Sequence, residues 1–357
     1  MGVMMAPVAG SGSTPAWMAL VPNLIVLFVL AAAKVGPSTC PVRPAYFRAL
    51  MPASRQAWAH LALFTVNFIY GVNYVVAKGL MPVVIGPSGF ILLRVLGAGT
   101  LFWLLRAIRP ERVAPGDLGR LLLCAITGVA LNQLMFFHGL MRTTPLNASI
   151  IMVATPILVL VLAGVLLKER ITWTKALGVL LGAAGALVLV VVKPSSTTAG
   201  PSALGDLFIL VNATAYGLFL VLVKPLMRKY SAVTIMAWSF LFGVVLVLPF
   251  GWRELGEVRW HALSAAHITA LAFVVVMVTF VSYLMNTWAM AYVNPTVVGA
   301  YIYMQPVLAA AFTWLFVWIG PERLGIPGSY STDIGIVQAI CALCIFAGVY
   351  LVGRADR

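Results

Sequence analysis

Charged residues are scarce in this sequence, and acidic residues are the scarcest of all. Only 9% of the 357 residues are charged, and Asp and Glu together number 9, whereas 62% of the residues are hydrophobic. In a soluble domain roughly a quarter of the residues are charged, so this composition excludes a soluble globular protein. The mean hydropathy is +1.04, and long apolar runs recur along the whole length. We therefore expect an all-α integral membrane protein.

Residues that carry chemistry are also few. Of the four cysteines, Cys341 and Cys344 have C-x-x-C spacing, but they lie inside an apolar helix, where packing explains them better than a redox or metal site. The sequence has no phosphate-binding loop, no group of metal ligands and no nucleophile paired with a base. We therefore expect no cofactor, no metal and no enzyme activity.

Ten apolar segments follow residue 56, each about as long as a membrane-spanning helix. They cover roughly residues 58–77, 87–106, 118–140, 146–167, 173–192, 204–223, 232–251, 265–289, 296–319 and 334–353. Residues 1–56 form an N-terminal extension. Within it, residues 17–33 are either an extra, marginal membrane helix or part of an over-extended upstream reading frame. We favour the second interpretation, because Met51 opens directly onto the first well-formed span.

The net charge of +14 does not point to a nucleic-acid partner. The 23 Lys and Arg residues mark the ends of the spans and form no patch with interleaved aromatic residues. Lys and Arg collect on the cytoplasmic side of membrane proteins. With the N-terminal extension placed inside, sixteen lie on the inner side and six on the outer, while Arg94 lies within a span. The sequence predicts a multi-pass plasma-membrane protein (bacterial inner membrane) with both ends of the ten-helix body in the cytoplasm.

The chain contains an internal repeat. Pro145 and Pro156 are eleven positions apart, and so are the prolines at the corresponding places in residues 294–323. Tyr70-Gly71 likewise recurs as Tyr216-Gly217, at an offset of 146. Because each copy holds five spans, an odd number, the second copy must be upside down relative to the first. Inverted repeats are typical of alternating-access transporters, whose substrate site lies between the repeats.

The fourth span ends in a motif that resembles EamA domains. Leu166-Leu167-Lys168-Glu169-Arg170 closes it, with a proline thirteen residues before the glutamate. Phe90-x3-Arg94 in the second span and Gly205-Asp206-Leu207 at the start of the sixth are also similar to that family. The resemblance covers residues 57–353. It implies the drug/metabolite transporter superfamily, with ten transmembrane helices as two inverted five-helix repeats and a central cavity.

The expected domain organisation follows from the repeat and the resemblance. The first EamA repeat covers residues 57–193 and the second covers residues 204–353, with a linker at 194–203 and a cytoplasmic tail at 354–357. Glycines such as Gly178, Gly182 and Gly185 permit close helix approach. Packing within the bundle is the first explanation of these glycines, and a homodimer is the alternative.

Prolines and polar residues inside the spans are the candidates for a substrate cavity. A proline lacks the N–H that would bond the carbonyl four residues earlier, so Pro156 and Pro306 free carbonyls that suit a polar cavity. Amides, hydroxyls and phenols suit neutral or zwitterionic solutes. The further candidates are Asn67, Tyr70, Asn73, Tyr74, Asn132, Gln133, Thr155, Asn212, Tyr216, Tyr283, Asn286, Tyr301 and Gln305. Arg94 is the intramembrane charge, which is costly and therefore indicates function.

We interpret the sequence as that of a secondary transporter for small metabolites, exporting amino acids or related solutes by alternating access. A sugar-phosphate or nucleotide-sugar transporter is an alternative, but it would need two or more basic residues in the cavity. A membrane-embedded lipid-modifying enzyme is the alternative from another class, and it would need a cluster of His and acidic residues at one membrane face. The predicted partners are a small-molecule metabolite and the lipid bilayer.

Overall fold

The computed structural model describes residues 53–81, 84–142, 148, 151–192, 203–305, 307–308, 311–312, 315 and 336–355. These residues are mostly helical and include no strand. Nearly all of the predicted N-terminal extension and linker lie outside the described residues, as does Pro306.

The helices of the first half form five successive units. They are α2 (Ala53–Leu80), α3 (Pro87–Ile108), the continuous run of η2 (Pro115–Asp117), α4 (Leu118–Ala125), η3 (Ile126–Ala130) and α5 (Leu131–Leu140), then α7 (Thr155–Leu167) and α8 (Trp173–Val192). The first helix begins at Ala53, five residues before the predicted start of the first span.

The second half repeats this order. It contains α9 (Ala203–Leu226), α10 (Ala232–Gly256), η4 (Trp260–Ala262), the run of α11 (Ala265–Phe273), η5 (Val274–Val281) and α12 (Ser282–Ala289), then α13 (Pro295–Tyr301) and α15 (Ile336–Arg354). Five helices of the described part are long and apolar enough to cross a membrane, namely Pro87–Ile108, Pro115–Leu140, Ala203–Leu226, Ala232–Gly256 and Ala265–Ala289.

Local sequence signals set several helix starts. Pro87 and Pro295 occupy the first turns of α3 and α13, where a missing N–H costs nothing. Ser231 accepts a hydrogen bond from the Thr234 N–H and caps α10. Ser264 and His267 form a capping box at α11. These caps fix the antiparallel turns between neighbouring helices.

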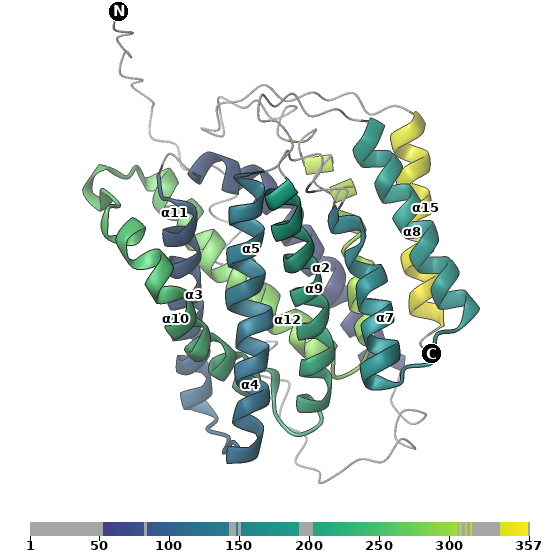
Figure 1. Cartoon of the computed structure of the whole chain (residues 1–357), viewed down its shortest axis with the longest axis horizontal. Coiled ribbons are helices and arrows are strands. Elements are labelled where there is room, and N and C mark those ends of the chain that lie inside the picture. Colours follow the sequence, from purple (N-terminus) through teal and green to yellow (C-terminus); the bar gives the residue numbers. More distant parts are fainter. Residues whose placement is uncertain are drawn as a thin grey trace, which may run out of the picture.

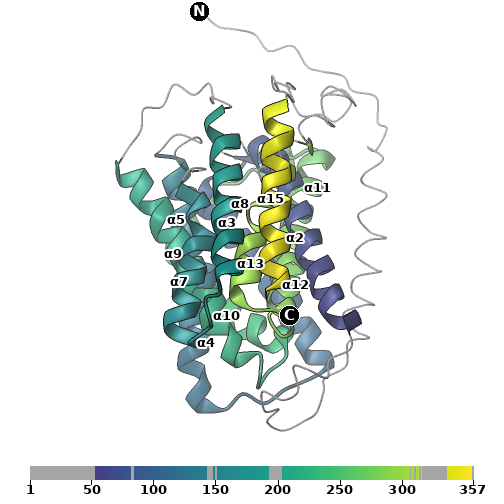
Figure 2. The same ribbon diagram turned by 90° about the vertical axis from the view of Figure 1, so that its right-hand side faces the viewer.

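The helices pack as a bundle whose two halves interleave. α3 lies along α10 near one edge, and α8 lies along α15 at the other (Figure 1). Figure 2 shows α8 and α15 from that second edge, with α13 beside them. Between the edges, α5 packs on α9, and α12 packs on α2. Each of these contacts joins a helix of the first half to one of the second.

Glycines allow the closest of these contacts. A Cβ atom added to Gly178 of α8 would lie 2.8 Å from the Gly348 carbonyl oxygen of α15, so no side chain fits there. Gly182 and Gly185 also face neighbours inside the bundle, Tyr303 and Cys341 among them. The expectation that these glycines serve packing within the bundle is confirmed, and the homodimer stays a prediction.

Candidate functional site

Arg94 is buried in the interior of the bundle. It projects from α3, is 6% exposed, and its Nε donates a hydrogen bond of 2.9 Å to the Thr279 hydroxyl of η5. The guanidinium carbon lies 5.5 Å from the centre of the Phe90 ring and 5.7 Å from that of Phe137. These contacts hold the charge inside the protein, so the side chain does not extend toward a membrane surface.

The guanidinium of Arg94 has no carboxylate partner in the described part of the chain. The ion pairs seen there join Glu169 to Lys175 and Asp117 to Lys229. Its two terminal nitrogens also make no hydrogen bond to any described residue, since the bond from Nε is the one this side chain makes. A buried arginine in this state keeps the four N–H donors of its two terminal nitrogens available for a ligand.

Two tyrosines from other helices lie near Arg94, and a third lies near both of them. Tyr70 of α2 and Tyr283 of α12 both interact electrostatically with Arg94, and Tyr216 of α9 interacts with both tyrosines. The Tyr283 hydroxyl donates to the Gly128 carbonyl at 3.0 Å. We call Arg94, Tyr70, Tyr216 and Tyr283 the central cluster. All four were predicted from the sequence, and the structure brings them together.

Two π-helical segments flank the central cluster. A π-turn widens the helix and loosens the regular carbonyl ladder, and such segments often occur at functional sites. In η5 the Thr279 hydroxyl donates to the carbonyl of Val274 five residues earlier, which leaves its oxygen free to accept from Arg94. Ser282 donates to the Met277 carbonyl in the same way. In η3, the Gly128 carbonyl is the one that Tyr283 binds.

Amides of the third and sixth predicted spans extend the polar interior. The Asn212 amide nitrogen donates to the Asn132 carbonyl oxygen at 2.7 Å, linking α9 to α5. Gln133 is buried and approaches the Tyr283 hydroxyl. Within the described residues, however, neither polar atom of its amide makes a hydrogen bond of normal geometry. Gln133 therefore offers a buried donor and a buried acceptor beside Tyr283 of the central cluster.

A second group of predicted residues lies between α2 and the segment that follows α13. The Gln305 amide donates to the Asn67 side-chain oxygen at 3.1 Å, and Asn67 donates to the Leu63 carbonyl. The Tyr301 hydroxyl is 3.0 Å from Nδ1 of His60. These residues are tied to one another, so their first evident role is to join the two halves.

The remaining candidates are scattered. Thr155 and Pro156 are buried where the chain turns at Ala154 and α7 begins, so the predicted interruption of the fourth span is present. Asn286 is buried in α12. The Asn73 side-chain oxygen is buried and has no hydrogen bond to a described residue. The side chain of Tyr74 and all of Pro306 lie outside the described residues.

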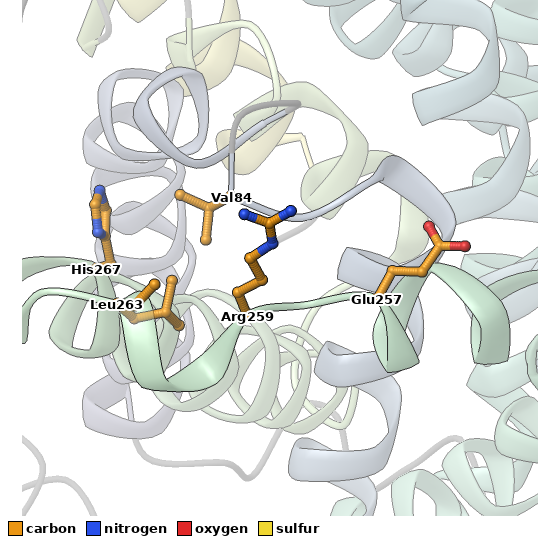
Figure 3. A pocket seen from close by; sticks show the side chains of 6 residues that line it. Val84, Glu257, Arg259, Leu263 and His267 are labelled. Atoms are coloured by element: carbon orange, nitrogen blue, oxygen red, sulfur yellow. The ribbon is translucent and has the colours of Figure 1, made fainter. Parts of the chain in front are cut away.

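A cavity of about 370 Å³ lies away from the central cluster, between the turn before α3 and the loop after α10. Arg259 points toward Val84 there, and the Glu257 carboxylate turns away from it (Figure 3). His267 lines the same cavity, but its ring serves the capping box of α11.

Sequence reasoning missed Thr279 and Ser282, which hold Arg94 and Tyr70. A single Ser or Thr in an apolar span does not by itself indicate a functional site, and the sequence does not reveal the π-helical turn that orients these hydroxyls. The repeat offset of 146 offers one signal for Thr279, because it pairs Thr279 with Gln133, which was already a candidate. The same offset pairs Arg94 with Phe240. Of the two paired positions, the one in the first half of the chain carries the charge of Arg94, and the one in the second half is apolar.

The comparison with protein families agrees with the motifs and the helical architecture. The pattern of the EamA-like transporter family matches residues 57–191 and 203–325. The chain belongs to the EamA-like transporter family, and it is a multi-pass membrane protein.

Several similar proteins have the names of transporters. The chain is 24% identical over 296 residues to an uncharacterized transporter of Archaeoglobus fulgidus, covering 82% of this chain and 96% of the relative. It is 26% identical over 231 residues to a probable terminal-alkyne amino-acid exporter of Streptantibioticus cattleyicolor, covering 62% and 72% respectively. A solved crystal structure has the same fold, with a TM-score of 0.64 at 17% identity, covering 84% of this chain and 97% of that one.

Proposed function

We propose that this protein exports amino acids or related small carboxylates by alternating access, and that the central cluster binds the substrate carboxylate. The observation that carries the proposal is the buried Arg94 guanidinium, whose two terminal nitrogens have no hydrogen-bond partner and no carboxylate among the described residues. A guanidinium matches a carboxylate through two parallel hydrogen bonds. The tyrosine hydroxyls and Gln133 supply neutral donors and acceptors for the rest of a zwitterionic solute.

The contacts across the bundle support two inverted five-helix repeats. Gly97 of α3 packs against Val275, and Gly243 of α10 packs against Val129. The two glycines are 146 residues apart in the sequence, and so are the two valines. In each case a glycine of one half meets the π-helical segment of the other half, so the two halves contact each other in the same way.

The first helix of each half also has a glycine contact at corresponding positions. Gly71 of α2 packs against Phe312, and Gly217 of α9 packs against Leu162. The first helix of each half thus rests on the proline-containing segment of the other. In the proposed cycle, each half pivots on these glycine contacts, while the central cluster, built from both halves, opens first to one side and then to the other.

The described residues of the central cluster favour neither of the two alternatives. A sugar-phosphate transporter would place several cations at the site, but the central cluster contains Arg94 as its one basic side chain. A lipid-modifying enzyme would need clustered acid, base or metal-ligating groups. Among the described residues no three His, Cys, Asp or Glu side chains are placed to hold a metal ion.

Counterflow in proteoliposomes tests the proposal. Vesicles preloaded with neutral amino acids should take up a labelled amino acid in a saturable manner. A carboxylate without an amine should compete, and an amine without a carboxylate should compete far less. Arg94→Lys should keep weak transport, and Arg94→Gln should lower kcat/KM by about 10- to 100-fold, which corresponds to one charge-assisted hydrogen bond. Equal competition by the amine and the carboxylate would contradict the proposed role of Arg94.

A further inference from the structure

A second, larger cavity opens at the end of the bundle where α7 and α9 finish. Its volume is about 630 Å³, and it lies between the α7–α8 turn, the end of α9 and the start of α13. We call it the basic cavity, because its lining includes Lys168, Arg170, Lys175, Lys224 and Arg228. Glu169 is the acidic residue of that lining.

The charges of the basic cavity divide into two sets. Lys175 is buried and pairs with Glu169, which neutralises the acid, and Lys224 donates to the carbonyls of Met290 and Val293 at the end of α12. The side chains of Lys168, Arg170 and Arg228 are exposed and make no ion pair or hydrogen bond with a described residue. Among the described residues, the mouth of the cavity therefore keeps three uncompensated positive charges.

The backbone presents one of these charges in an unusual way. Lys168 has a φ of 54°, the one positive value at a non-glycine residue in the described part of the chain. This is the left-handed position that ends a helix, where glycine or asparagine is favoured because a Cβ is unfavourable. The backbone alone disfavours a lysine at this position, so its presence there favours a role for its ammonium group in the cavity.

The basic cavity also borders the lipid-facing surface. Leu166 lines it and is 53% exposed, and Ile171 and Trp173 of the same turn are 52% and 85% exposed. In a membrane protein such apolar side chains face acyl chains, and tryptophan is typical of the boundary with the headgroups. The mouth of the cavity is thus cationic, and exposed apolar side chains lie beside it.

We propose that the basic cavity binds the phosphate headgroup of an anionic phospholipid, whose acyl chains lie along Leu166 and Ile171. Basic pockets between helices at a membrane face suit anionic headgroups. A zwitterionic lipid fits less well, because its own ammonium group would meet Lys168, Arg170 and Arg228. This site is separate from the central cluster and does not depend on the proposed substrate.

Lipid binding to the purified full-length protein in detergent tests the proposal, with native mass spectrometry as the readout. Phosphatidylglycerol should bind, and phosphatidylcholine should bind at least about tenfold more weakly. Glycerol 1-phosphate, which has the phosphate but no acyl chains, should compete only at much higher concentration. If it competes as well as phosphatidylglycerol, the cavity is a site for soluble phosphates, and the lipid proposal is wrong. Equal binding of the two lipids would overturn it as well.

Charge variants localise the binding. The double variant Arg170→Gln/Arg228→Gln should weaken phosphatidylglycerol binding by about 25-fold, since each cation near a membrane surface contributes about fivefold. The control Arg109→Gln/Arg112→Gln removes the same charge from exposed positions after α3, on the same face of the bundle but outside the cavity. It should leave binding unchanged. An equal loss in both variants would show that binding follows net charge alone.

Lys168→Gly separates function from folding. Glycine suits the left-handed backbone at this position, so the variant should fold and melt at or above the temperature of the parent protein. It should nevertheless bind phosphatidylglycerol about fivefold more weakly. Unchanged lipid affinity in this stable variant would remove Lys168 from the proposed site.

Discussion

At the scale of single residues, the position of Arg94 depends on contacts that compensate its burial only in part. An arginine at the centre of a membrane helix costs about 2.5–3.5 kcal/mol or more. The hydrogen bond to Thr279 and the faces of Phe90 and Phe137 offset part of that cost. A bound carboxylate would supply the remaining hydrogen bonds, so the empty site and the occupied site should differ measurably in stability.

Thr279 is a positioning residue, and its replacement tests the site without removing the charge. Thr279→Val deletes the acceptor for Arg94 Nε, so the guanidinium loses its fixed orientation. We expect the KM for an amino acid to rise about tenfold with a smaller change in kcat, because one hydrogen bond to a charged group contributes about 1.5 kcal/mol or more. Initial rates in proteoliposomes give both constants.

Two matched variants complete this test. Thr279→Ser keeps the hydroxyl and should restore the KM of the parent protein. Thr100→Val removes an exposed hydroxyl that bonds only to the Leu96 carbonyl of its own helix α3, and it should change neither constant. A normal KM in Thr279→Val would show that the contact with Arg94 has no part in binding.

At the scale of helices, hydrophobic length and start signals made most elements predictable. The span expected at residues 265–289 matches the run from Ala265 to Ala289, and the spans that begin with Pro87 and at Ala232 start where expected. The π-helical segments were not predictable, because Val274–Val281 is a plain apolar run in which no residue marks the wider turn. Thr279 and Ser282 therefore escaped notice, whereas Arg94 stood out as a charge.

The contact between α8 and α15 depends on glycine, and its disruption should be local and steric. In Gly348→Ala, the added Cβ would lie 2.6 Å from the Gly178 carbonyl oxygen and 2.7 Å from the Gly182 nitrogen. Both are backbone atoms, so whole helices must move apart. We expect a loss of about 1–3 kcal/mol in the free energy of unfolding, seen as a lower melting temperature in detergent.

Gly119→Ala is the matched control for this variant. Gly119 lies in α4, and a Cβ there would meet nothing within 4 Å. Alanine favours the helix by about 0.5–1 kcal/mol over glycine, so this variant should melt at the same temperature or slightly higher. Similar losses in both variants would mean that close approach of α8 and α15 is not what Gly348 provides.

At the scale of the whole molecule, the two halves have a similar order of helices in the described residues, but they differ at the central cluster. The glycine contacts of Gly97 and Gly243 lie at the same offset of 146 residues as the Tyr-Gly motif. The site does not repeat, because Phe240 stands in the second half where Arg94 stands in the first. A repeat found in sequence can therefore reveal the framework, but it does not show which half carries the charge or how its helix turns are widened to bind it.

The predicted orientation in the membrane follows from the same framework and can be tested directly. Arg112 precedes α4 and Glu257 follows α10, and both residues are exposed. The distribution of Lys and Arg places the first in the cytoplasm and the second outside. In a cysteine-free background, a membrane-impermeant maleimide added to intact cells should label Glu257→Cys and leave Arg112→Cys unlabelled until the cells are opened. Labelling of Arg112→Cys but not of Glu257→Cys in intact cells would show that the predicted orientation is wrong. The face of the protein assigned to the cytoplasm would then lie outside the cell.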